Sequence, residues 1–159
     1  MGEEMVRVRV KGVGMASEDS QPVVILEETA GSGTLAVSVG AFEAGAILME
    51  LEGLSTPRPL THDLLAQLFV EQRLKLDRVE LYGLYGPDED GFLARIYYGR
   101  RFRLRARDVR PSDALALAVA MRAPVYVHPS LLGDARSAGA TASAVDPTDG
   151  YWFLEHAGQ

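Results

Sequence analysis

Two similar stretches, Arg58-Pro-Leu-Thr-His-Asp-Leu-Leu65 and Arg110-Pro-Ser-Asp-Ala-Leu-Ala-Leu117, indicate where two helices of this chain begin. In both, an Arg-Pro pair precedes a hydroxyl residue, an acid and a run of apolar residues. Proline is favoured at the first helical position, serine and threonine at the N-cap, and acids at the positive end of the helix dipole. We therefore expect helices from about His62 to Arg73 and from Pro111 to Met121.

The segments around these two helices carry the patterns of β-strands. From Met5 to Val13, valines alternate with basic residues, which is the period of a half-buried strand. A further helix is expected from about Ala41 to Glu52, between Gly40 and Gly53. The other expected strands are Pro22–Glu27, Thr34–Val39, Asp77–Tyr85, Phe92–Tyr98, Arg101–Arg107 and Pro124–His128. With 159 residues, 47% of them hydrophobic, the chain is predicted to form one α+β domain with mixed or antiparallel sheets or a partial barrel and about three helices.

The character of the chain changes beyond Leu132. Residues 133–150 are rich in Gly, Ala, Ser and Asp, a composition typical of a mobile tail. Tyr151-Trp-Phe-Leu154 then restores a dense apolar patch. Because such a patch is not expected to stay free in water, it should fold back on the domain or dock on a second subunit. We assign residues 1–133 to the domain and residues 134–159 to the tail.

The composition excludes several classes of protein and site. There is no cysteine, which rules out disulfides, thiolate zinc sites and cysteine nucleophiles. No apolar run approaches the ~18 residues of a membrane span. The N-terminus carries Glu3 and Glu4 where a secretory signal has a basic region, so we expect a cytoplasmic protein with no membrane partner. The glycines of Gly31-Ser-Gly33 match the residue pattern of a dinucleotide-binding motif, but that motif requires a helix after the glycines. Here a strand pattern follows, so we do not expect a dinucleotide site.

Basic charge is concentrated in one segment of an acidic chain. The net charge is −6, yet seven of the 16 basic residues fall between Arg95 and Arg110. In the stretch from Arg101 to Arg107, arginines alternate with Phe102, Leu104 and Ala106, which predicts four arginines on one strand face, ~6.6 Å apart, and the apolar residues facing the core. One interpretation is an edge strand protected by charge; the other is a track for backbone phosphates, with Arg103 and Arg105 as contacts.

Three acids, Glu43, Asp63 and Asp113, each fall in the first turn of an expected helix. With Gly40 as N-cap, Glu43 takes position N3, and with Thr61 as N-cap, Asp63 takes N2. Asp113 takes N1 if Ser112 is the cap, or N3 if Arg110 caps and Pro111 is N1. In the purely structural interpretation, each acid stabilises its helix dipole by about 0.3–1 kcal/mol.

The functional interpretation of these acids is a metal site. A helix N-terminus favours the ionised carboxylate, which suits a metal ligand and does not suit a general acid. The same field disfavours a histidinium at His62, so its ring is expected to be neutral. Carboxylates at Glu43, Asp63 and Asp113 with a neutral imidazole are a ligand set for a hard divalent cation, Mg²⁺ or Mn²⁺.

The combination of motifs resembles the bifunctional nuclease domain family. The resemblance covers residues 5 to about 133 and rests chiefly on the two Arg-Pro stretches, together with Val39-Gly-Ala-Phe-Glu-Ala44 and Pro124-Val-Tyr-Val127. It implies an α+β fold, a homodimer or higher homo-oligomer, and hydrolysis of both RNA and DNA. One departure is Phe42, where relatives commonly carry a polar residue. On matching positions the resemblance points to Glu43, Arg58, Thr61, His62, Asp63, Arg110, Ser112 and Asp113.

Two functions follow from these residues. In the first, a nuclease holds a cation with Glu43, Asp63 and Asp113, His62 activates water, and arginines 58 and 110 bind the scissile phosphate. In the second, the same Arg-Pro turns capture an anion or a partner protein without catalysis, and the arginines pair with the acids at the helix starts. Geometry separates the two, because the first requires the three carboxylates to converge.

Overall fold

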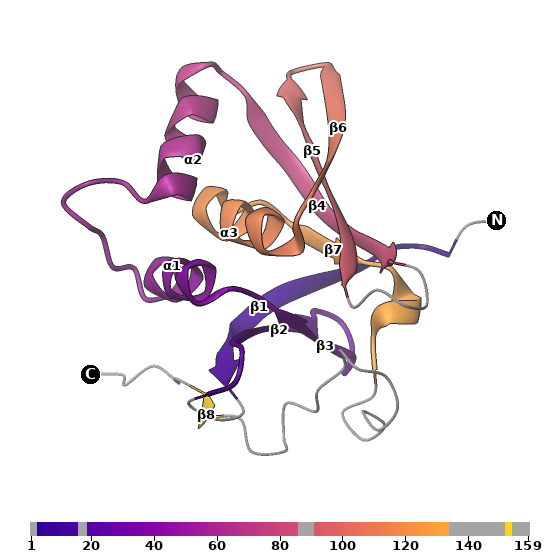
Figure 1. Ribbon diagram of the computed structural model, residues 1–159. Coiled ribbons are helices and arrows are strands. Elements are labelled where there is room, and N and C mark those ends of the chain that lie inside the picture. Colours follow the sequence, from indigo (N-terminus) through magenta and orange to yellow (C-terminus); the bar gives the residue numbers. More distant parts are fainter. Residues whose placement is uncertain (1–2, 16–18, 86–90, 134–151, 154–159) are drawn as a thin grey trace.

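The computed structural model describes residues 3–15, 19–85, 91–133 and 152–153, in which three α-helices and one mixed β-sheet are found (Figure 1). The helices are α1 (Ala41–Leu51), α2 (Thr61–Glu71) and α3 (Pro111–Met121), and a 3-10 turn spans Pro129–Leu131. The strands are β1 (Val6–Met15), β2 (Val23–Glu28), β3 (Thr34–Ser38), β4 (Lys75–Leu84), β5 (Phe92–Arg100), β6 (Arg103–Val109), β7 (Val125–Val127) and β8 (Trp152–Phe153). The α+β prediction is confirmed.

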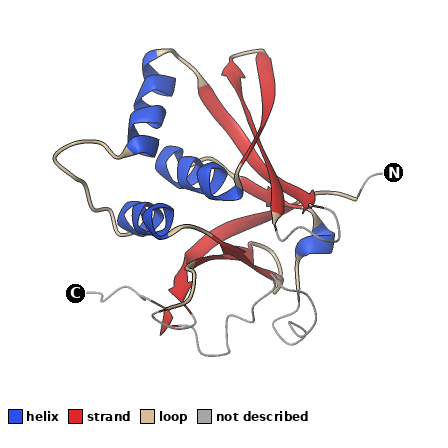
Figure 2. Cartoon of the chain, in the orientation of Figure 1, coloured by secondary structure: helices blue, strands red, loops and turns tan. Residues whose placement is uncertain are grey.

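The strands are joined in the order β3-β2-β1-β7-β4-β5-β6, so that short β7 connects two antiparallel groups. β7 runs antiparallel to β1 and parallel to β4. The turn at Gly31–Gly33 joins antiparallel β2 and β3, so a strand and not a helix follows the glycines, as the strand pattern after them predicted. Figure 2 shows the two groups of strands diverging from β7 with the helices on the side between them.

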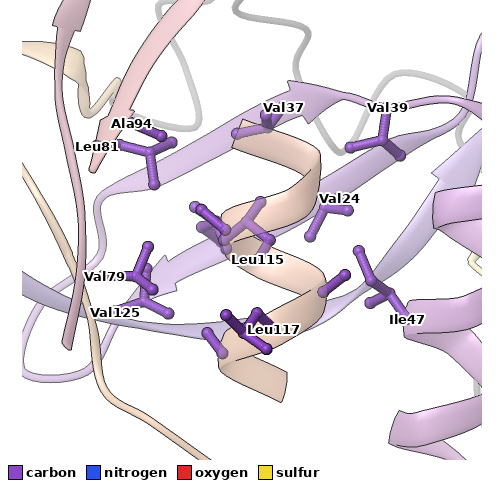
Figure 3. Close-up of a cluster of buried hydrophobic side chains, with 14 of the residues drawn as sticks. Val24, Val37, Val39, Ile47, Val79, Leu81, Ala94, Leu115, Leu117 and Val125 are labelled. Atoms are coloured by element: carbon purple, nitrogen blue, oxygen red, sulfur yellow. The ribbon is translucent and has the colours of Figure 1, made fainter. Parts of the chain in front are cut away.

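Helix α3 lies at the centre of the core. It packs against α1, α2, β3, β4 and β5, and Leu115 and Ala114 are fully buried. Figure 3 shows Leu115 and Leu117 of α3 among valines of both strand groups, Val24 and Val37 on one side and Val79 on the other. One helix therefore fills the space between the two groups, and its N-terminus is fixed relative to α1 and α2.

The three helices begin with the same local geometry. Their N-caps are Gly40, Leu60 and Arg110, all with extended backbone and none with a side-chain cap hydrogen bond. Thr61 and Ser112 are thus not the caps: Pro111 takes N1, where its missing N–H costs nothing.

Two apolar stretches are largely exposed. In α2, helical spacing places Leu64, Leu65, Leu68 and Phe69 on one side of the helix, and of these four only Phe69 is buried. In β6, the prediction that Phe102, Leu104 and Ala106 face the core is wrong: Phe102 is 87% exposed and precedes the strand, and Leu104 and Ala106 are exposed within it. The register with β5 gives the reason: Arg107 is opposite the core residue Ile96, so Leu104 and Ala106 lie on the other face of the sheet, away from the core.

The ends of the predicted domain are only partly described. The backbone of Trp152–Phe153 pairs antiparallel with Gly14 and Met15 of β1, so this piece of the aromatic patch returns to the domain. The rest of the predicted tail lies outside the described residues, as does the segment 86–90 between β4 and β5. No helix in the described ranges is long and apolar enough to cross a membrane. A cytoplasmic location stays a prediction.

Candidate functional site

All three acids at the helix starts occupy position N3. The confirmed N-cap Gly40 places Glu43 there, and Asp63 and Asp113 follow from the caps Leu60 and Arg110. An acid at N3 can reach back toward the N-cap backbone and faces the positive end of the dipole. The similar sequence motifs therefore produce equivalent local positions, but the surroundings of the three acids differ.

Arg110 joins the starts of α1 and α3. Its Nε donates to Oδ2 of Asp113 at 2.7 Å and its Nη2 donates to Oδ1 of the same carboxylate at 2.8 Å. The same Nη2 also donates to Oε1 of Glu43 at 3.3 Å. The hydrogen bonds to Asp113, followed by the charges of both acids, raise the pKa of Arg110. Bidentate pairing with Asp113 fixes the plane of the Arg110 guanidinium as well as its position.

The backbone at Gly40 makes room for Glu43. The Glu43 carboxylate folds back over the α-carbon of Gly40, so that a β-carbon at position 40 would collide with its Oε2 atom. The φ of Gly40 is −68°, which any residue can adopt, so glycine is needed here for space and not for conformation. Because Gly40 has no side chain, the Glu43 carboxylate can take this position and accept a hydrogen bond from Arg110.

A hollow of about 600 Å³ lies where the three helices begin; we call it the helix-start pocket. Its polar rim carries a guanidinium, an imidazole and two carboxylates, and its walls are mostly apolar, a combination typical of binding sites. The lining residues are Phe42, Glu43 and Ala46 of α1, Leu60, Thr61, His62 and Leu65 at α2, Val109 of β6, and Arg110, Asp113, Ala116 and Leu117 at α3.

Asp63 is separated from the other two acids. Its Oδ2 accepts the backbone N–H of Leu60 at 3.1 Å, and the residue lines a different hollow, beside Pro57 and Pro59. Its contact with His62 is long, 3.9 Å from Oδ1 to Nε2. In the described part of the chain no three histidines or acids lie together as a metal group would. The predicted set of three carboxylates is therefore not brought together: Glu43 and Asp113 share Arg110, and Asp63 caps its own helix.

The other predicted site residues divide in the same way. Thr61 and His62 line the helix-start pocket, and His62 is largely sheltered, with 17% of its side chain exposed. Ser112 is buried at N2 of α3 and does not line the pocket. Arg58 is exposed in the loop before α2 and is not a lining residue either. Arg103 and Arg105 lie on β6, and both are exposed.

None of the apolar lining residues was predicted from the sequence to belong to the site, among them Phe42, Leu65 and Val109. Phe42 is 93% exposed, and this exposure of an aromatic side chain beside a polar rim is a feature of binding surfaces. Only Phe42 carried a signal in the sequence, since it departs from the polar residue of the resembled family. Leu65 and Val109 fit ordinary core patterns, so nothing in the sequence marked them.

The fold and pocket define an α+β domain with a polar-rimmed pocket at the starts of its three helices. The chain belongs to the bifunctional nuclease domain family, whose model matches residues 24–139. It is also similar to two proteins of Mycobacterium tuberculosis, the uncharacterized proteins MT1877 (strain CDC 1551 / Oshkosh) and Rv1829 (strain ATCC 25618 / H37Rv). Each is 36% identical over 131 residues, which cover 82% of this chain and 76% of the relative.

Proposed function

We propose that this protein is a nuclease that hydrolyses phosphodiester bonds of RNA and DNA at the helix-start pocket. The observation that carries the proposal is the grouping of Arg110, His62, Glu43 and Asp113 around one hollow, in a chain of the bifunctional nuclease domain family. Three helix N-termini point their partial positive charges at this region, which favours a phosphate.

The chain's own groups supply the main elements of the reaction. Arg110 neutralises charge on the phosphate oxygens, and Asp113 and Glu43 hold its guanidinium in place. His62 accepts a proton from the attacking water, whose oxygen forms the new bond to phosphorus. The bond from phosphorus to the leaving oxygen breaks, and that oxygen takes up a proton from solvent water. Leu65 and Phe42 provide apolar surface at the hollow.

Hydrolysis assisted by Mg²⁺ or Mn²⁺ is proposed separately from the roles of the side chains. A site built from Glu43, Asp63 and Asp113 does not fit the positions of these residues, because Asp63 lines a different hollow. Glu43 and Asp113 remain together, and Mg²⁺ is commonly held by one or two carboxylates with substrate phosphates. No step above depends on a metal, and a chelator decides whether Mg²⁺ or Mn²⁺ takes part.

A second function is favoured by one observation, the pairing of Arg110 with two acids. A guanidinium already held by Asp113 and Glu43 is what the non-catalytic alternative predicted. In that case the pocket binds an anion or a partner protein and cleaves nothing. However, the Arg110 side chain is 66% exposed, so a phosphate can reach it without breaking the bidentate pair.

A homo-oligomer also remains a proposal. Leu54 and Val70 are 60% and 69% exposed, and exposed apolar side chains of this size are common at subunit contacts. Sedimentation of the purified chain over a range of concentrations gives its mass in solution. A mass of one chain at all concentrations would contradict the proposal.

The test is a nuclease assay on stringently purified protein, with single-stranded RNA and DNA, with and without a chelator. We expect cleavage by the wild type and a loss of at least about 100-fold in His62→Gln, the usual range for a general base. His128→Gln, a histidine outside the pocket, is the matched control. Equal cleavage by wild type and His62→Gln would point to contamination or another site, and absence of wild-type cleavage would favour the binding function.

A further inference from the structure

We propose, resting on the nuclease function above, that Arg103, Arg105 and Arg107 of β6 form a track that binds the phosphates of single-stranded RNA or DNA and leads the strand into the helix-start pocket. We call these three residues the β6 arginine track. The substrate class is then a single strand, which enters the pocket along β6.

The register of the sheet fixes the face on which the track lies. Residues directly opposite each other in antiparallel strands share a face. Arg105 is opposite Tyr98, Arg107 is opposite Ile96, and Val109 is opposite Ala94. Because Ile96 and Ala94 belong to the core, the arginines point to the side of the sheet that carries the helices.

The track ends at the pocket. Val109, the next residue on the same face after Arg107, lines the helix-start pocket, and Arg110 follows it directly. Alternate residues of a strand are about 6.6–6.8 Å apart, so Arg103, Arg105 and Arg107 form evenly spaced cations, and Arg110 lies beyond them at the end of the strand. β6 is an edge strand, and Arg103 to Asp108 are all exposed, so this row is open to a ligand.

The charges of the track are not neutralised by the protein. On the opposite face of this group of strands, Arg95 of β5 pairs with Asp108 of β6 at 2.7 Å, and on neighbouring β4 Arg78 pairs with Glu80 at 2.7 Å. These two arginines also lie over the rings of Tyr82 and Tyr97. Within the described ranges, the three arginines of the track form no ion pair or hydrogen bond through their side chains. Adjacent like charges repel, and a polyanion laid along them removes that repulsion.

The other side of the path suits exposed bases. Leu65 of α2 lines the pocket and is 42% exposed, and Leu68, one turn further, is also exposed. Tyr98, opposite Arg105, is half-buried against Phe69, with ring centroids 5.5 Å apart. Apolar and aromatic side chains contact base faces, which are available in single strands and are stacked inside a duplex. One row of cations beside an apolar wall therefore fits a single strand.

The test measures binding separately from cleavage. A labelled single strand of about 12 nucleotides with hydrolysis-resistant phosphorothioate linkages is titrated with the full chain at several salt concentrations, and fluorescence anisotropy is recorded. The variant carries Arg103→Gln, Arg105→Gln and Arg107→Gln. The control carries Arg7→Gln, Arg9→Gln and Lys11→Gln, which removes three cations at the same alternating spacing from β1, where Arg9 is paired with Glu27. A duplex of the same sequence and poly-glutamate are further ligands.

We expect the wild type to prefer the single strand over the duplex. The track variant should bind it more weakly, with a salt slope reduced by about 2, since each phosphate contact in a single strand contributes about 0.7. The control should keep the wild-type slope. An unchanged slope in the track variant overturns the inference, as does equal binding of duplex or of poly-glutamate.

The failure of the nuclease function and the failure of the track can be told apart. If the strand binds as expected but ordinary oligonucleotides are not cleaved, the nuclease function alone is refuted. If the track variant binds and cleaves like the wild type, the track alone is refuted.

Discussion

At the scale of single residues, the two Arg-Pro turns have similar sequences and different surroundings. Arg110 is held by Asp113 and Glu43 at the rim of the pocket, whereas Arg58 is exposed in the loop before α2. The difference follows from the neighbours: α3 begins beside α1, so its first arginine meets the Glu43 carboxylate. Substitutions at Arg58 can therefore serve as controls for the same substitutions at Arg110.

We predict that Arg110→Lys lowers kcat/KM for oligonucleotide cleavage by at least about tenfold. Lysine keeps the charge and loses the bidentate geometry, and hydrogen bonds between charged groups contribute about 1.5–3 kcal/mol. Arg58→Lys is the matched control and should change kcat/KM little, since Arg58 does not line the pocket. A larger effect at Arg58 would support its predicted role at the scissile phosphate and contradict the arrangement described above.

We also predict that Gly40→Ala disturbs Glu43 without unfolding the chain. The added β-carbon displaces a flexible carboxylate, and the backbone at position 40 is compatible with alanine. The thermal midpoint should stay within a few degrees, and the variant should reproduce the activity loss of Glu43→Gln. Full activity in Gly40→Ala, with a clear loss in Glu43→Gln, would show that Glu43 acts from a different position.

At the scale of elements, the periodic patterns predicted the helices and most strands because alternation and helical spacing depend on local burial. The alternation alone could not tell which face of β6 meets the core. The pairing with β5 places Arg107 on the face of the core residue Ile96, and Leu104 and Ala106 on the opposite face. In α2, helical spacing groups Leu64 and Leu68 with Phe69, but α3 occupies the centre of the core and the two leucines stay exposed.

The pairing of β5 with β6 should depend on pH. The hydrogen bond from Arg95 lowers the pKa of Asp108, so the folded state binds the proton more weakly than the unfolded state. The resulting stability is present above the unfolded pKa of about 3.9 and is lost as the pH falls through the lower, folded pKa. We expect Asp108→Asn to reduce the free energy of unfolding at neutral pH, and the difference from wild type to shrink in acid.

Urea unfolding of both proteins at several pH values measures this difference. Asp19→Asn, which removes an acid from another exposed position, is the control for net charge. A difference between wild type and Asp108→Asn that stays constant down to the acid limit would contradict the assigned pairing of Asp108 with Arg95.

At the scale of the whole molecule, α3 determines both the core and the site. Its apolar residues fill the space between the two strand groups, and its N-terminus carries Arg110 and Asp113 to the starts of α1 and α2. The sequence could indicate each helix start, but not their relative directions, which depend on this packing. Asp63 occupies the same N3 position as Glu43 and Asp113. Because the helix directions were not known from the sequence, its place outside the pocket could not be predicted.

We predict that Leu115→Ala lowers the free energy of unfolding by about 2–5 kcal/mol, the usual cost of a cavity at a fully buried leucine. Leu64→Ala, the same change at an exposed position of α2, should cost about 1 kcal/mol or less. Denaturant unfolding of the two variants gives both values. Equal costs would mean that α3 is not the centre of the core.

The most direct test of the account is nuclease activity in two variants that change the same residue type at the same helical position, Asp113→Asn and Asp63→Asn. The account predicts that Asp113→Asn loses at least about tenfold in kcat/KM, since the Arg110 pair at the pocket is weakened. Asp63→Asn should keep near wild-type activity and lose only about 0.3–1 kcal/mol of stability through α2. Equal loss in both variants, or loss in Asp63→Asn alone, would contradict a catalytic site at the helix-start pocket.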